Sequence, residues 1–331
     1  MSTSPGGSPL PLEVRMSVTE RAPIPLRPHF LGSGPYPEHR WRVVCWSVLA
    51  GFALTVIWSA PFVDSVIGDS VANTLLGHNA KETPIGGVLA GTFFAFVSGL
   101  AGTFTACNIA AFGAVAPLVG GETTGRPKLV DTLKPLGWIA SGMLTVSVVY
   151  GVIVALVGTR MPQFSTASSP GGLTPRNIQS MIVYGVIGIV FIVLGLASVG
   201  LVRNPIAGLA RRFPPAPLVL MGALIGGFLI GRPFPLFRMM FRSAAESHNV
   251  FYGAAAFALQ SVGNILVMAL LFLLLTHGTG GRLQRWMLAK PARIAVVTGA
   301  ALLVAGTFTL LYWDLRVLGR TGVIWYPTIK W

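Results

Sequence analysis

Long apolar runs separated by short polar loops make up most of this chain. Each run is long enough to form a membrane-spanning helix, which needs about 20 apolar residues at a rise of about 1.5 Å per residue. The expected spans cover residues 42–62, 86–119, 136–158, 179–202, 217–237, 250–276 and 294–313. The pattern therefore predicts an all-α polytopic membrane protein with seven transmembrane helices.

Two of the apolar segments are interrupted helices. Residues 86–121 are rich in glycine and alanine and hold Cys107, and residues 218–244 hold Pro233 and Pro235. These segments open spans two to four and spans five to seven, which cross the membrane in opposite senses. Paired interruptions in two halves of opposite topology are typical of inverted-repeat membrane proteins, whose site lies between the halves. We therefore expect one N-terminal anchor helix followed by a 3+3 inverted repeat with proline-broken first helices.

The composition divides the chain into five segments. Residues 1–40 contain eight prolines and no apolar period, which predicts a disordered cytoplasmic arm and not a cleaved secretory signal. The other expected segments are the anchor helix with its outer loop at 41–85, the first three-helix repeat at 86–202, the inverted second repeat at 203–315 and a C-terminal tail at 316–331.

Composition and charge agree with this class. Hydrophobic residues make up 53% of the chain and charged residues 10%, far from the roughly 25% charged residues of soluble domains. The formal net charge of +14 comes from cations in short loops beside the spans, which indicates membrane topology and no nucleic-acid partner. The positive-inside rule places the N-terminus in the cytoplasm, and seven spans then place the C-terminus outside. We predict a multi-pass protein of the cytoplasmic membrane whose partner is the lipid bilayer.

Several common catalytic and cofactor motifs are missing from the sequence. It contains no Walker A, HExxH, CxxC or nucleophile-elbow motif and no pair of histidines placed to bind haem. The sequence therefore does not support an ATPase, a metalloprotease or a conventional haem cytochrome. We predict no cofactor and no metal site, and the sequence leaves open whether the protein is an enzyme.

A few polar residues lie inside the predicted spans and are candidate site residues. Asn108 follows Cys107 directly, and Gln260 and Asn264 lie four residues apart on one helical face. Amides in hydrocarbon need partners, so these side chains should face the protein interior, either as packing contacts or as the lining of a site. Arg232 lies well inside the fifth span, where a charge is costly and marks a candidate functional site.

Arg238, Arg242 and Glu246 follow Arg232 in the sequence and form one stripe at four-residue spacing. If the fifth span ends early, these are interfacial residues that reach the headgroups. If it does not, they form a cationic lining suited to an anionic solute or an acidic partner. Both interpretations stay open.

The broken segments resemble those of a known family. Thr105-Ala106-Cys107 and Gly231-Arg232-Pro233-Phe234-Pro235 are similar to the two motifs of the transmembrane region shared by DsbD and CcdA, thiol–disulfide proteins of cytochrome c biogenesis. The resemblance covers roughly residues 86–313 and rests mainly on layout. It implies a role in cytochrome c or redox-enzyme maturation, with Cys107 as the reactive residue and a thioredoxin-like or cytochrome-assembly protein as partner.

One departure from that family changes the expected chemistry. Phe234 stands where the family has its second cysteine, and disulfide exchange needs a resolving sulfur. The other cysteine of this chain, Cys45, could supply it, or the two thiols could be unrelated and buried. Three functions remain: thiol exchange through Cys107, transport of a small solute such as an anion or a metal, and service as an accessory subunit. The expected substrate-binding residues are Asn108, Arg232, Phe234, Gln260 and Asn264.

Overall fold

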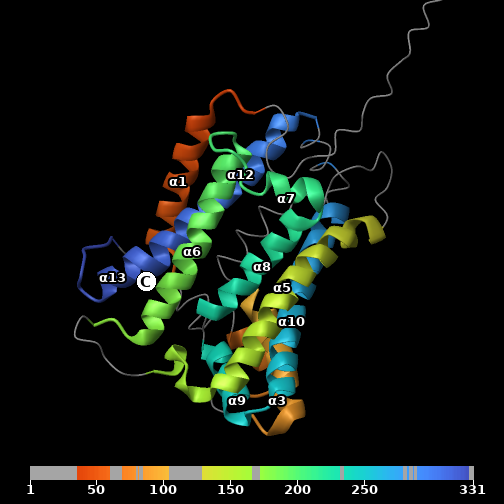
Figure 1. Ribbon diagram of the computed structural model, residues 1–331, viewed down its shortest axis with the longest axis vertical. Helices are drawn as coiled ribbons and strands as arrows, with labels where there is room; N and C mark the ends of the chain where they lie inside the picture. The colour runs from red at the N-terminus through yellow and green to blue at the C-terminus, as the bar shows by residue number, and fades with distance from the viewer. Residues whose placement is uncertain are drawn as a thin grey trace, which may run out of the picture.

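The computed structural model describes residues 36–59, 69–79, 81, 85–103, 129–165, 172–231, 235–278, 282, 286 and 289–327. These residues form helices and connecting turns, and the described part of the chain contains no strand. Figure 1 shows the helices side by side in an elongated bundle. The expectation of an all-helical fold is confirmed.

Among the described residues, eight helices build the bundle: α1 (Arg40–Ile57), α3 (Gly87–Gly102), α5 (Leu129–Val157), α6 (Pro175–Ser198), α8 (Ala216–Gly231), α9 (Pro235–Ser247), α10 (Val250–Gly278) and α12 (Pro291–Leu310). Shorter elements connect or extend them: α2 (Ser70–Leu76), η2 (Gly158–Arg160), η3 (Pro162–Phe164), α7 (Ala207–Arg212), the π-helix η4 (Leu311–Leu315) and α13 (Arg316–Arg320).

Five of the described helices are long and apolar enough to cross a membrane, which fits a multi-pass membrane protein. They cover Arg40–Ile57, Leu133–Arg160, Pro175–Ser198, Val250–Leu274 and Ala292–Arg320. The pair α8 and α9 adds a sixth if it counts as one span, although the two helices are bent by 83° relative to each other. The bend falls where the sequence predicts an interrupted helix. α3 is apolar but only 16 residues long, so the predicted number of seven spans remains a prediction.

The last span is longer than the sequence pattern predicts. We expected it to end at residue 313, but the helix continues through η4 and α13 to Arg320. Asp314 and Arg316 therefore lie within a helical span and not in a loop beyond it. Leu315, Val317 and Leu318 supply the apolar surface that continues the helix.

Two apolar clusters form the core. The first lies among α5, α6, α8, α10 and α12 and includes the fully buried rings of Tyr184 and Phe191. The second joins α3, α5, α9 and α10 around Phe241 and Phe257, whose rings stack with centroids 4.7 Å apart. Because α9 contributes to this second cluster, it is held against the bundle by its apolar face.

Two pairs of helices lie parallel and very close. A Cβ atom added at Gly99 of α3 would lie 1.9 Å from the carbonyl oxygen of Gln260 in α10. In the same way, a Cβ atom added at Gly222 of α8 would lie 1.9 Å from the carbonyl oxygen of Ile139 in α5. Small residues that let backbones approach are common between membrane helices, where close packing replaces the hydrophobic effect as the driving force.

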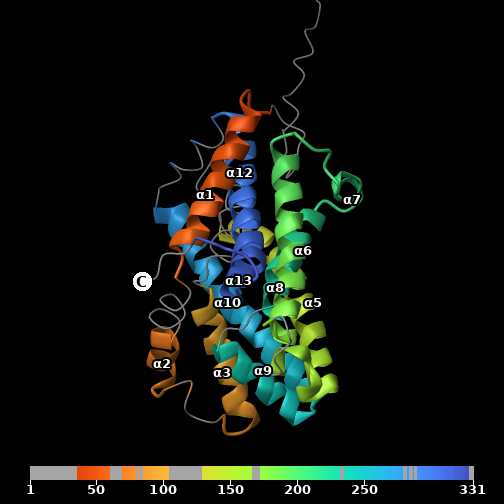
Figure 2. The ribbon, with the colours of Figure 1, turned by 90° about the vertical axis from the view of Figure 1, so that its left-hand side faces the viewer.

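Two further pairs cross in opposite directions. α5 meets α10 where Gly151 faces Gly253, and a Cβ atom added at either would lie 2.5 Å from the other's carbonyl oxygen. α6 meets α12 along a glycine seam in which Gly188 faces Gly306. α1 packs on α12, as Figure 2 shows. These contacts fix the order in which the helices lie side by side.

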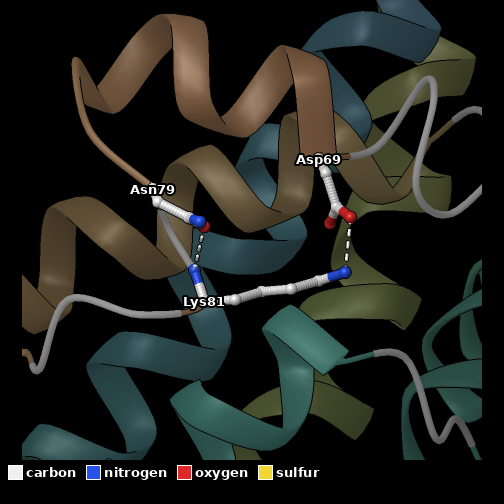
Figure 3. Close-up of polar contacts among 3 residues, drawn as sticks. All are labelled: Asp69, Asn79 and Lys81. Carbon is white, nitrogen blue, oxygen red and sulfur yellow. Dashed lines mark hydrogen bonds and ion pairs between the residues drawn. The ribbon is translucent and has the colours of Figure 1, made fainter.

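The short helix α2 packs against α3. Polar contacts hold together the described residues on either side of it. Lys81 forms an ion pair with Asp69, and its backbone N–H donates to Asn79 Oδ1 at 3.2 Å (Figure 3). The Lys81 side chain is 37% exposed, and exposed ion pairs contribute about 0–1 kcal/mol. This contact shapes the loop and adds little to the stability of the bundle.

Candidate functional site

The C-terminal end of α8 is capped by side chains of α6. The last carbonyls of a helix have no partner within that helix, and inside a membrane each unsatisfied group costs several kcal/mol. Three α6 side chains donate to them: Gln179 Nε2 to Ile230 O at 2.8 Å, Ser180 Oγ to Gly231 O at 2.5 Å and Tyr184 OH to Phe228 O at 3.0 Å. α8 can therefore end inside the protein at little cost.

A small cavity lies beside this cap. Arg176 from the first turn of α6 and Arg238 from α9 line it, together with Gln179 and Ser180. The Nε atom of Arg176 and the Oε1 atom of Gln179 are buried and have no hydrogen-bond partner among the described residues. Two cations therefore line this small cavity, and one buried donor and one buried acceptor of its lining residues remain without a described partner.

A second polar cluster lies at the end of α3. Thr103 Oγ1 lies 2.9 Å from Asn264 Oδ1 of α10 and 3.1 Å from Gly99 O of its own helix. Gln260 is 2% exposed and Asn264 is 4% exposed. The prediction that both amides face the protein interior is confirmed, whereas their role in binding a substrate stays a prediction.

Four of the six predicted site residues lie outside the described residues: Cys107, Asn108, Arg232 and Phe234. In the sequence, Cys107 follows Thr103 by four residues and Arg232 follows Gly231 directly. The expected juxtaposition of Cys107 and Phe234 therefore stays a prediction.

The described cysteine, Cys45, faces away from the helix packing. Ser47, Gly51 and Thr55 form the buried face of α1, while Cys45 is exposed. A residue two positions along a helix points to nearly the opposite side, so Cys45 lies across the helix from Ser47. Nothing in this arrangement directs Cys45 toward the bundle interior, where the resolving partner of Cys107 would be needed.

The stripe formed by Arg238, Arg242 and Glu246 fits the interfacial interpretation in one part and the lining of a site in the other. Arg242 Nε donates to Glu246 Oε1 at 2.8 Å, and these side chains are 70% and 55% exposed. They are surface residues, as the interfacial interpretation expects. Arg238, one turn earlier, instead lines the cavity beside the end of α8.

Two charged residues of the last span were missed because the span was predicted to end at residue 313. Arg316 is 6% exposed, and its Nη1 donates to Thr55 O at 2.7 Å and to Trp58 O at 2.8 Å. Its guanidinium also lies 4.9 Å from the centre of the Tyr312 ring. The Asp314 carboxylate faces Gly185 of α6, where an added Cβ atom would lie 3.2 Å from Oδ1. The apolar residues that follow Asp314 were the signal that could have found them.

The polar end of α3 permits a direct test of its contribution to stability. Thr103→Val keeps the side-chain shape and removes the hydroxyl, which leaves Asn264 Oδ1 without this donor. We expect a loss of about 1–3 kcal/mol in the free energy of unfolding, the cost of an unmade buried hydrogen bond. Thr145→Val is the matched control, because the exposed Thr145 hydroxyl bonds only to a carbonyl of its own helix. Equal unfolding free energies for the two variants would contradict the prediction.

Comparisons with known proteins identify no relative. No protein-family model matches the sequence, and searches among curated proteins and among solved structures find no match. Among the described residues, no three His, Cys, Asp or Glu side chains gather in a way that could hold a metal ion. Any assignment of function therefore depends on the geometry described above and on the sequence motifs.

Proposed function

We propose that this protein is a membrane carrier that moves a small solute by alternating access, with its site between the ends of α3 and α8. The observation that carries this proposal is the length of these two helices, each 16 residues. Both are apolar, yet both are shorter than the roughly 20 residues that a bilayer requires. Each also ends beside buried polar side chains, and discontinuous helices of this kind form the substrate sites of many transporters.

The proposed carrier is a 3+3 inverted repeat preceded by the anchor α1. The first triplet is α3, α5 and α6, and the second is α8 with α9, α10 and α12. In this repeat α3 is equivalent to α8, α5 to α10 and α6 to α12. The parallel contact of α3 with α10 is therefore equivalent to the parallel contact of α8 with α5. The contacts of α5 with α10 and of α6 with α12 each join two equivalent helices. The matching approaches of Gly99 to Gln260 O and of Gly222 to Ile139 O support this relation.

In this proposal the chain has seven membrane crossings, with the N-terminus in the cytoplasm and the C-terminus outside. The alternating directions support it, because α3 runs parallel to α10, and α5 runs antiparallel to α10. The cations in the first turn of α1, Arg40 and Arg42, support a cytoplasmic N-terminus of a protein in the cell membrane.

A role in cytochrome c or redox-enzyme maturation is the second candidate. It depends on Cys107, which follows the buried end of α3 at Thr103 by four residues. Because Cys45 is exposed on the outer side of α1, the resolving thiol would come from a thioredoxin-like or cytochrome-assembly partner. In the proposed step, the Cys107 thiolate attacks a disulfide of the partner. It forms a mixed disulfide with one of the two partner sulfurs and releases the other as a thiolate.

Uptake into proteoliposomes tests the carrier and separates it from the thiol protein. The full-length chain is reconstituted, and uptake of labelled phosphate, sulfate, acetate and zinc is measured against empty vesicles. We expect saturable uptake of at least one of these solutes. Asn264→Leu should reduce it by about tenfold, which corresponds to about 1.4 kcal/mol of lost transition-state stabilisation. Cys107→Ser should leave it unchanged.

One control variant and two further outcomes make the result decisive. Thr145→Val changes an exposed hydroxyl of α5 and should transport as the wild type does. Uptake no faster than in empty vesicles for all four solutes would contradict the carrier function. A partner protein trapped through Cys107 by a mixed disulfide, and lost in Cys107→Ser, would instead support redox maturation.

A further inference from the structure

The cavity beside the end of α8 brings together two arginines from distant parts of the chain. Arg176 comes from the first turn of α6 and Arg238 from the second turn of α9, and both line this cavity. Because both side chains line the same small cavity, their positive charges lie on neighbouring walls. Like charges held at one cavity destabilise the protein unless something of opposite charge offsets them.

No described acidic side chain plays that part. The ion pairs of the described residues join Lys81 to Asp69 and Arg242 to Glu246, and neither involves this cavity. The Nε atom of Arg176 is buried without a hydrogen-bond partner among the same residues. A guanidinium has five N–H donors in a planar fork that matches the oxygens of a carboxylate or a phosphate. The unused donor of Arg176 and the lack of a described counter-charge both favour an anion, whereas the unpartnered Gln179 Oε1 is an acceptor and takes no part in binding it.

The backbone at the N-terminus of α6 also favours a negatively charged ligand. α6 begins at Pro175, and the Thr174 side chain caps it by accepting from Asn177 N–H. The N-terminus of a helix carries a partial positive charge that attracts anions. Gln179 Nε2 and Ser180 Oγ already donate to α8 carbonyls, so the arginines are left as the principal donors toward a ligand.

We propose that Arg176 and Arg238 bind a small anion with carboxylate or phosphate-like oxygens at this cavity. The inference deepens the proposed carrier function, on which it rests, because it names the class of substrate. In the proposed repeat, α6 belongs to the first triplet and α9 to the second, so the anion would contact both halves. Arg238 is exposed and Arg176 is partly buried, which places Arg238 at the mouth and Arg176 farther in.

Anion binding can be measured on the purified full-length protein in nanodiscs of phosphatidylcholine, with inorganic phosphate as the probe. We expect saturable binding in isothermal titration calorimetry. R176Q and R238Q should each raise the dissociation constant by about tenfold or more, as expected for the loss of one charge-assisted contact. R176K and R238K should recover part of the affinity, because they keep the charge and lose only the planar fork.

The matched control is R242Q. Arg242 lies on the same helix as Arg238, one turn along, but pairs with Glu246 at the surface and does not line the cavity. It should bind phosphate as the wild type does. The proposal is overturned if the wild type shows no saturable binding, if R176Q and R238Q bind as well as R242Q, or if R242Q loses binding to the same extent.

The anion could come from solution or from a lipid headgroup, and a second set of nanodiscs separates these sources. Phosphate binding that is unchanged in discs containing phosphatidylglycerol supports a free solute. Competition by phosphatidylglycerol would overturn the substrate role and assign the site to a headgroup. Because binding is measured without transport, phosphate binding through Arg176 and Arg238 by a protein that moves no solute would refute the carrier alone. Solute uptake together with unaltered binding in R176Q would refute only the anion site.

Discussion

Alanine at Gly99 or Gly222 should lower the free energy of unfolding by about 3 kcal/mol, at the upper end of the cost of overpacking. At each site the new methyl group would lie 1.9 Å from a carbonyl oxygen of the neighbouring helix. The obstacle is backbone and cannot rotate away, so α3 must move from α10, or α8 from α5. Reversible unfolding in mixed detergent micelles, followed by circular dichroism, measures the effect.

Gly137→Ala is the control for this pair. Gly137 also lies in a helix, α5, but a Cβ atom added there meets nothing within 4 Å. Alanine should stabilise that helix by about 0.5–1 kcal/mol, because glycine loses more conformational freedom on folding. If Gly99→Ala and Gly222→Ala prove as stable as Gly137→Ala, the close parallel pairs do not exist. Similar losses at Gly99 and Gly222 would agree with their equivalence in the proposed repeat.

Arg316→Gln should detach the end of α1 from the bundle. The Arg316 guanidinium donates to the carbonyls of Thr55 and Trp58, which lie at the C-terminal end of α1 and have no following helical turn to bind them. Hydrogen bonds to a charged group contribute about 1.5–3 kcal/mol each, so we expect a loss of about 3 kcal/mol. Hydrogen–deuterium exchange should also rise selectively over residues 50–57.

Arg320→Gln separates this effect from a general loss of positive charge. Arg320 lies one turn further on, at the end of α13, and is exposed. Its replacement should change neither the unfolding free energy nor the exchange of α1. Equal exchange over residues 50–57 in the two variants would show that Arg316 does not hold α1.

The ends of the helices show how far sequence patterns reach. The apolar run that begins at residue 86 continues to residue 119, and the sequence predicts an interruption within it without giving the residue at which the helix ends. α3 ends at Gly102, and Thr103 turns to Asn264 of α10. At the other end of the chain, the apolar pattern predicts that the last span ends at residue 313, just before Asp314. The helix continues because Arg316 finds carbonyl partners on α1. In both places, contacts between distant helices decide where a helix ends.

In the candidate site, too, some features could be predicted from the sequence and others depend on contacts between distant helices. The burial of Gln260 and Asn264 could be predicted, because an amide within an apolar run must turn toward other protein groups. The pairing of Arg176 with Arg238 at one cavity could not, because no local pattern links the start of α6 to α9. Arg238 and Arg242 lie on the same face of α9, yet only Arg238 lines the cavity, because it lies one turn nearer the end of α8.

The sequence by itself determined the class of this protein: helical, multi-pass, and interrupted near Pro233 and Pro235. These properties follow from hydropathy and backbone chemistry, which act over one or two helical turns at a time. Only the tertiary structure decided which helices lie parallel, at which residue α3 ends, and which cations meet. Those features depend on partners far apart in the chain, such as Arg316 and Trp58 at a separation of 258 residues, and packing alone brings such residues together.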